Sequence, residues 1–138
     1  MTAFVIDCSV AVTWCFEDEA TLASDGLLDR LGEEGAAAPG IWPLELGNVL
    51  VMAERRGRLS AAKIAEFVAL VQDLPVAIDE ETPRRALDDV LSLARSEGLT
   101  TYDAAYLELA MRLGVPLATK DTALQRAAEN LGTPVLAV

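Results

Sequence analysis

The chain has 138 residues, 52% of them hydrophobic, and its 22 acidic and 11 basic side chains give a net charge of −11. The length and hydrophobic content support one compact domain over residues 1–138. The sequence contains no uncharged apolar stretch of about 18 residues, so no membrane span is expected. Histidine is absent, which excludes histidine-dependent catalytic triads and histidine-based zinc sites. Carboxylates therefore dominate the available chemistry, and they favour Mg²⁺ or Mn²⁺.

The expected location of the protein is the cytoplasm. The first residues lack the basic segment and the small-residue cleavage site that mark exported proteins. Cys8 and Cys15 have no CxxC spacing and are expected to be reduced thiols. The strong negative charge argues against non-specific binding of nucleic acid and suits a basic protein partner.

Short apolar runs alternate with amphipathic stretches in the first half of the chain. Residues 3–6 predict a buried strand, and residues 9–16 predict a helix with Ser9 as its N-cap. Hydrophobic spacing then predicts, in chain order, a helix over residues 19–31, a weak strand and turn over 36–41, and helices over 42–56 and 60–74.

The second half continues the alternation. A helix is predicted over residues 82–97, with Leu87 among the residues of its apolar face. The other predicted elements are a strand over 75–78, a helix over 102–113, a strand over 115–119, a helix over 121–131 and a strand over 133–138. Alternating strands and helices with short connections predict an α/β fold with a mainly parallel sheet.

Four acidic residues are candidates for function, although each also has a local explanation. Asp7 suits a turn after the first strand, and Glu45 suits a solvated helix face. Asp103 lies in the first turn of a helix capped by Thr100 or Thr101, where the helix dipole favours a carboxylate. Asp121 has the position of an ordinary N-cap.

The predicted topology gives these acids a common position. Asp7 and Asp121 both follow strands of a parallel sheet, and ligands of such sheets bind beyond the carboxyl ends of the strands. If these strands are neighbours, their carboxylates converge and repel one another by several kcal/mol. A divalent cation relieves this repulsion without protonating the carboxylates.

Four segments of the chain resemble the PIN-domain family, and more narrowly the VapC toxins of bacterial toxin–antitoxin pairs. They are "VIDCSV", "PLELGNVL", "LTTYDAAYLELA" and "LATKDTAL", in that order. The third is the most specific, because an aspartate followed by Ala-Ala-Tyr in a helix is typical of these toxins. The resemblance implies a three-layer α/β/α sandwich around a mainly parallel sheet and a metal-dependent endoribonuclease.

The resemblance also implies roles for individual residues. Asp7, Glu45, Asp103 and Asp121 match the family's four acids in order. Asp7, Asp103 and Asp121 would mainly hold one or two Mg²⁺ ions, for which Mn²⁺ can substitute. Glu45 would orient the attacking water or hold the metal through a second water. Further positions that match pocket-lining residues are Ser9, Asn48 and Thr119.

Partners follow from the same resemblance. The substrate would be transfer or ribosomal RNA, the protein a homodimer, and the inhibitor a VapB-like antitoxin that inserts an arginine among the carboxylates. Basic residues that could meet RNA are Arg55, Arg56, Arg58, Arg84, Arg85, Arg95, Arg112, Lys120 and Arg126. Four aromatic residues could form an apolar surface for a partner, although such residues more often belong to the core. They are Trp14, Phe16, Trp42 and Phe67.

Two other functions compete with the nuclease. The first is a catalytically idle PIN-like module kept for protein contacts, against which the complete set of acids argues. The second is a receiver-like phosphoryl-transfer domain, which Thr119, Lys120 and Asp121 superficially suggest. The first strand, however, lacks the acid pair that a receiver needs, and Asp79 does not supply it.

Overall fold

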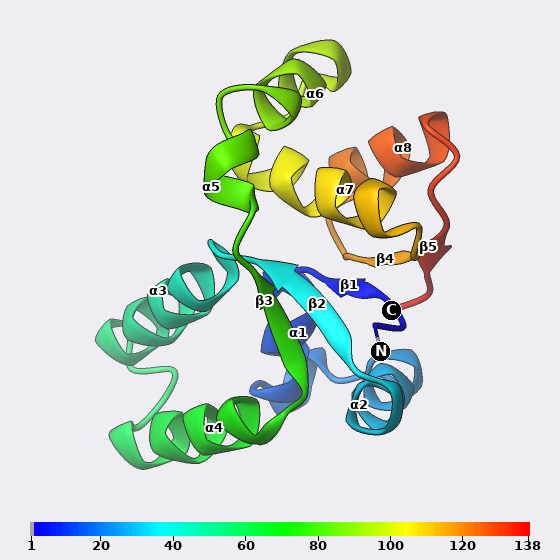
Figure 1. The fold of residues 1–138 in the computed structure, drawn as a ribbon. Coiled ribbons are helices and arrows are strands. Elements are labelled where there is room, and N and C mark those ends of the chain that lie inside the picture. Colours follow the sequence, from blue (N-terminus) through cyan, green and yellow to red (C-terminus); the bar gives the residue numbers. More distant parts are fainter. Residues whose placement is uncertain (1) are drawn as a thin grey trace.

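A five-stranded sheet lies at the centre of the computed structural model, which describes residues 2–138 (Figure 1). The strands are β1 (Val5–Ile6), β2 (Ala36–Pro39), β3 (Val76–Asp79), β4 (Leu117–Ala118) and β5 (Val135–Leu136). Their order is β3-β2-β1-β4-β5, and every neighbouring pair is parallel. The predicted α/β class with a parallel sheet is confirmed, and β1, which precedes Asp7, is the central strand.

Helices cover both faces of the sheet. They are α1 (Cys8–Ala11), α2 (Leu22–Glu34), α3 (Trp42–Arg55), α4 (Ala61–Asp73), α5 (Thr82–Arg85), α6 (Asp89–Glu97), α7 (Thr101–Leu113) and α8 (Thr122–Asn130). Helix α7 packs against β1, β2 and β4, and Figure 1 shows α1 and α2 on the opposite side of the sheet. The three-layer α/β/α arrangement is therefore confirmed. None of the helices within residues 2–138 is long and apolar enough to cross a membrane.

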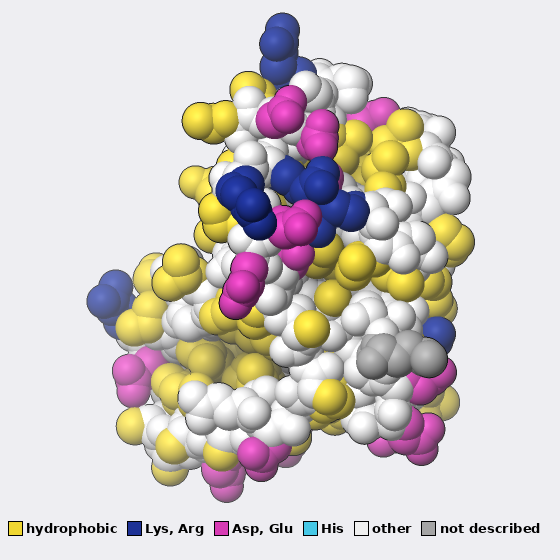
Figure 2. Space-filling view, viewed as in Figure 1, with side chains coloured by type: hydrophobic (Ala, Val, Ile, Leu, Met, Phe, Trp, Pro, Cys, Tyr) yellow, Lys and Arg dark blue, Asp and Glu magenta, His cyan; other side chains and the backbone are white. Residues whose placement is uncertain are grey.

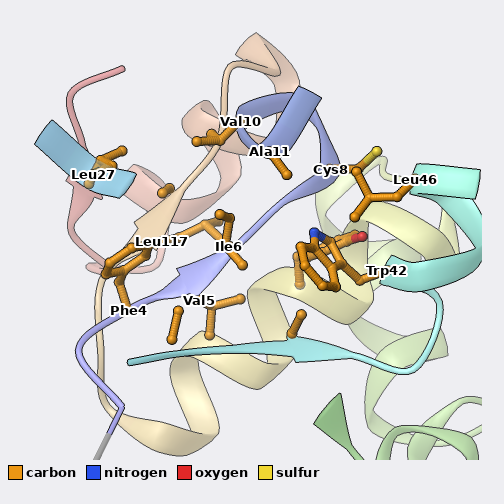
Figure 3. Packing of buried hydrophobic residues seen from close by; sticks show 14 of the residues in the cluster. Phe4, Val5, Ile6, Cys8, Val10, Ala11, Leu27, Trp42, Leu46 and Leu117 are labelled. Atoms are coloured by element: carbon orange, nitrogen blue, oxygen red, sulfur yellow. The ribbon is translucent and has the colours of Figure 1, made fainter. Parts of the chain in front are cut away.

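The core is built around β1. Phe4, Val5 and Ile6 are completely buried, and each contributes about 1.5–3 kcal/mol through the apolar surface that it removes from water. Figure 3 shows Trp42 and Leu46 of α3 reaching the start of α1 beside Cys8. This packing ties α3 to the strand end at which Asp7 lies.

The first helix is shorter than predicted. Helix α1 ends at Ala11, and a 3₁₀ turn, η1 (Val12–Trp14), follows it. Asp7 occupies the N-cap position without a capping hydrogen bond from its side chain, so the prediction that Ser9 caps this helix is wrong. Ser9 Oγ instead donates to Asp7 Oδ2 at 2.9 Å, because the nearby carboxylate is a stronger acceptor than a neutral group.

The second helix is displaced along the sequence. Helix α2 begins at Leu22 rather than at Glu19, because Thr21 forms a capping box with Ser24. The Thr21 hydroxyl accepts from Ser24 N at 2.9 Å, and Ser24 Oγ accepts from Thr21 N at 2.8 Å. The preceding acidic residues form the 3₁₀ turn η2 (Glu17–Glu19). These two hydrogen bonds satisfy helix donors that would otherwise be unpaired, and they set where the helix starts.

The single helix predicted over residues 82–97 is two helices. Helix α5 ends at Arg85 and α6 begins at Asp89, and the backbone of Asp88 is not helical (φ −124°, ψ −103°). The break turns Leu87 outward, so that 87% of it is exposed. The prediction that Leu87 lies on the apolar face is wrong, because that prediction required one unbroken helix with a continuous 3.6-residue period.

Candidate active site

The register of the central strands places Asp7 against Thr119. Ile6 of β1 pairs with Ala118 of β4, and Asp7 N donates to Ala118 O at 3.0 Å. The next side chains therefore meet, and Thr119 Oγ1 donates to Asp7 Oδ2 at 2.6 Å. Together with Ser9, this hydroxyl fixes a carboxylate that is only 6% exposed.

The same two hydroxyls connect Asp7 to the backbone that leads into α8. Ser9 Oγ accepts from Lys120 N at 2.9 Å, and Thr119 Oγ1 accepts from Asp121 N at 3.1 Å. Because each hydroxyl accepts from this loop and donates to Asp7, the loop and the carboxylate hold one another in place. Ser9 and Thr119 thus both contact Asp7, and their role as pocket-lining residues stays a prediction.

Glu45 and Asp103 reach the site from the first turns of two helices, α3 and α7. Thr100 caps α7 by accepting from Asp103 N at 3.1 Å, which confirms the predicted cap. Glu45 is half-buried, and its Oε1 accepts a hydrogen bond from the Tyr106 hydroxyl. The positive ends of both helix dipoles favour carboxylates at these positions.

Asp121 is the N-cap of α8. Its Oδ1 accepts from Leu124 N at 2.8 Å, so the local interpretation of this residue is correct. This hydrogen bond engages one of the two carboxylate oxygens. The cap and a role in the site are therefore compatible.

The carboxylates interact electrostatically. Burial raises the pKa of Asp7, although the hydrogen bonds from Thr119 and Ser9 oppose the shift. Burial also raises the pKa of Glu45, and the charges of Asp7 and Asp103 raise it further. The pKa of Asp103 is raised by burial and by the charges of Asp121 and Asp7. All four candidate acids therefore belong to one electrostatically coupled group.

The chemistry of this group fits a hard divalent cation, because its donors are carboxylate and hydroxyl oxygens. Within residues 2–138, however, no three acidic or cysteine side chains converge closely enough to hold a metal ion as they stand. The acids are therefore near enough to repel one another without closing around one point. A cation bound among them would have to draw them together.

Comparisons with known proteins identify the family. The family model of the PIN domain matches residues 4–130. The chain belongs to the PIN domain family. Ribonuclease VapC3 of Pyrobaculum aerophilum is 32% identical over 90 residues, which cover 65% of this chain and 69% of that protein.

Solved structures share the fold of this PIN domain. The crystal structure of PAE2754 from Pyrobaculum aerophilum matches with a TM-score of 0.74 and 25% identity, covering 97% of this chain and 89% of that one. The crystal structure of FitAcB from Neisseria gonorrhoeae matches with a TM-score of 0.66 and 17% identity, covering 97% and 96%. This likeness extends over almost the whole of the chain.

Two further polar residues of the PIN domain lie on the helices that carry Glu45 and Asp103. Asn48 is exposed on α3, one turn after Glu45, and its place in the pocket stays a prediction. Tyr106 is completely buried and contacts Glu45, although sequence reasoning assigned it no role beyond membership of a motif. Its spacing of three residues from Asp103, one helical turn, is the signal that placed it on the side of the site.

Several basic residues proposed to meet RNA are already paired within the PIN domain. Arg58 Nη2 lies 3.0 Å from both Asp18 and Glu19, and its guanidinium stacks over the Phe16 ring at 3.8 Å. Arg85 and Arg112 pair with carboxylates near α5 and α7, where Figure 2 shows both charges mixed. Among the described residues, the candidates outside any ion pair are Arg55, Arg56, Arg84, Arg95, Lys120 and Arg126.

An apolar groove runs between α3, α4 and β3, with a volume of about 360 Å³. Trp42, Leu46 and Phe67 contribute to its lining, and Figure 2 shows the apolar side chains gathered in this hollow. Trp42, Phe67 and Phe16 are buried, and Trp14 is half-buried with its Nε1 bonded to Ser24 O. The core assignment of these aromatics is therefore correct, while two of them also face the groove.

Proposed function

We propose that the protein is a metal-dependent endoribonuclease and the toxin of a type II toxin–antitoxin pair. The observation that carries the proposal is a buried Asp7 carboxylate at the end of the central strand, held by Ser9 and Thr119. In addition to burial, Asp7 raises the pKa of both Glu45 and Asp103, and Asp121 also raises that of Asp103. Membership of the PIN domain family and the similarity to a protein named Ribonuclease VapC3 support the same activity.

In the proposed mechanism, Asp7, Asp103 and Asp121 hold Mg²⁺ or Mn²⁺. When bound there, such an ion would supply Lewis-acid chemistry, which would polarise the scissile phosphate and lower the pKa of a water molecule. Ser9 and Thr119 keep the Asp7 carboxylate in one orientation through hydrogen bonds of 2.9 and 2.6 Å. Glu45 orients the attacking water, and the products carry a 5′-phosphate and a 3′-hydroxyl.

The proposed substrate is transfer or ribosomal RNA, read partly by the shape of its loops. Lys120 adjoins Asp121 and belongs to no ion pair within residues 2–138, so it is the best-placed candidate to meet the phosphate backbone. In this proposal the protein acts in the cytoplasm as a homodimer. Its antitoxin places a basic side chain among the carboxylates and apolar side chains in the groove between α3 and α4.

The proposal is tested with purified protein and total RNA in the presence of Mg²⁺ or Mn²⁺. Wild-type protein is expected to cut RNA at discrete positions, and the cuts should disappear with a chelator or in Asp7→Asn. Mapping RNA ends in cells that express wild type or Glu45→Gln then identifies the target. Cleavage that persists in Asp7→Asn would come from a contaminating nuclease and would refute the proposal.

The alternative is a catalytically idle PIN domain that acts through protein contacts. The spacing of the acids favours it, because no three acidic or cysteine side chains of the described residues converge as a ready metal site. Mn²⁺ binding measured by calorimetry separates the two functions. Binding that is lost in Asp7→Asn supports the nuclease, whereas a wild-type protein that neither binds Mn²⁺ nor cuts RNA supports the idle module.

A further inference from the structure

We propose that Tyr106 is a positioning residue: its buried phenol holds the Glu45 carboxylate in the orientation that the active site requires. The proposal deepens the nuclease function described above and rests on it. Tyr106 lies on α7 and Glu45 on α3, 61 residues apart in the chain. The two helices present their side chains to one another at the edge of the acidic group.

The surroundings of Tyr106 make its hydroxyl a dedicated donor. The residue is 0% exposed, so water cannot replace the carboxylate as a partner for the phenol. Burial and the adjacent Glu45 charge raise the pKa of Tyr106, which keeps the phenol protonated. A buried donor left without a partner is costly, so the phenol favours the rotamers of Glu45 that bring Oε1 to it.

Glu45 needs such an anchor. Its side chain is long, and fixing a glutamate costs up to about 2 kcal/mol of rotamer entropy. The hydroxyls of Ser9 and Thr119 serve Asp7 instead. Among the hydrogen bonds of residues 2–138, the Tyr106 phenol is the only side-chain donor to the Glu45 carboxylate. One Glu45 oxygen is thus held by Tyr106, and the other is left for the site.

The helical spacing explains how one element serves two acids. Asp103 and Tyr106 are one turn apart on α7, so they lie on the same face of the helix. Asp103 contributes its carboxylate directly, and Tyr106 acts through a residue of another helix. The Asp-Ala-Ala-Tyr sequence therefore joins α7 to α3 at the site, while the intervening Ala104 and Ala105 pack against Val90 and Ala94 of α6.

The kinetic test is a double-mutant cycle with Tyr106→Phe, Glu45→Ala and the double variant. Tyr106→Phe is expected to lower kcat about 10-fold with little change in KM, since a positioned acid–base group contributes about 10²–10⁴-fold. In the Glu45→Ala background the same change should have no further effect on kcat. Tyr102→Phe, in an exposed tyrosine of the same helix, is the matched control and should retain wild-type kinetics.

A second readout does not depend on activity. In the metal-free protein, the hydrogen-bonded phenol proton of Tyr106 should give a slowly exchanging downfield NMR signal. The signal should be lost in Tyr106→Phe, retained in Tyr102→Phe, and shifted upfield in Glu45→Gln, whose neutral amide is a weaker acceptor. An unshifted signal in Glu45→Gln would overturn the contact.

Equal losses of kcat in the wild-type and Glu45→Ala backgrounds would also overturn the proposal, because they would show a purely structural role. A wild-type protein without any nuclease activity would refute the proposed function instead. In that case the NMR signal still decides whether Tyr106 fixes Glu45.

Discussion

Asp79, at the carboxyl end of β3, tests how strongly one ion pair stabilises this fold. The Arg112 guanidinium donates to both of its oxygens, from Nη1 to Oδ1 at 3.1 Å and from Nη2 to Oδ2 at 2.8 Å. The Thr82 hydroxyl adds a third hydrogen bond at 2.7 Å. With these partners the pKa of Asp79 falls from 3.8 to about 2, mainly through the hydrogen bonds from Arg112.

The lowered pKa gives the expected size of the effect. Its difference from 3.8 corresponds to about 2.4 kcal/mol of stability at neutral pH, at 1.36 kcal/mol per pKa unit. The Asp79 side chain is only 14% exposed, so solvent screens the pair weakly. Since the folded-state pKa is the lower one, this stability is fully present above pH 4. It is about halved at pH 3, and it disappears as the pH falls through 2.

The measurement is urea unfolding of wild type and Asp79→Asn at pH 7 and pH 3. The variant should lose about 2.4 kcal/mol at pH 7 and about half of that at pH 3. Asp29→Asn, at an exposed position of α2, is the matched control and should stay within about 0.5 kcal/mol of wild type. A loss at pH 3 equal to that at pH 7 would show that packing rather than charge explains the effect, and the reasoning would fail.

Three further predictions concern the acidic group. Asp7→Asn should raise the Tm of the chelator-treated protein, because burial raises the pKa of Asp7 and ionisation at neutral pH therefore opposes folding; an unchanged or lower Tm would contradict this. Mn²⁺ at 100 times its Kd should stabilise wild type by about 2.7 kcal/mol in thermal unfolding, and equal stabilisation of Asp7→Asn would place the ion elsewhere. Thr119→Val should lose about 1–3 kcal/mol in urea unfolding, since it removes a 2.6 Å hydrogen bond to Asp7. Thr122→Val, at an exposed position, should lose little, and similar losses in both variants would argue against the hydrogen bond.

The features that follow from local chemistry were predictable from the sequence. The apolar run before Asp7 forms the buried central strand, because a parallel strand covered on both faces has continuous hydrophobic character. The Thr100 and Asp121 caps were also predictable, since capping depends on neighbouring residues. These caps place the starts of α7 and α8, and with them two of the acids.

Contacts between distant segments were not predictable in the same way. Ser9 fits an N-cap locally, yet its hydroxyl turns to Asp7 and accepts from Lys120 N, 111 residues further along the chain. Leu87 fits an apolar stripe only if the helix is unbroken, whereas the backbone leaves the helical conformation at Asp88, before α6 begins. At Ser9 a tertiary contact outweighs the local pattern.

Arg58 shows the same effect on the surface. A run of basic residues at the end of α3 suggested contact with RNA, but the folded chain brings Asp18 and Glu19 to Arg58 from 40 and 39 residues earlier. The sequence shows which residues are charged, but only the folded structure shows which of them form ion pairs. The net charge of −11 therefore does not show that fewer basic side chains are free to meet RNA than the sequence contains.

The strand order has a consequence for synthesis of the protein. Asp7 lies at the end of the central strand, whereas β4 and Asp121, which complete that edge of the sheet, come more than a hundred residues later. A chain still growing on the ribosome carries the early carboxylates without the last one, and it lacks the Thr119 hydroxyl that fixes Asp7. Translation itself thus delays assembly of the acidic group until most of the polypeptide has emerged.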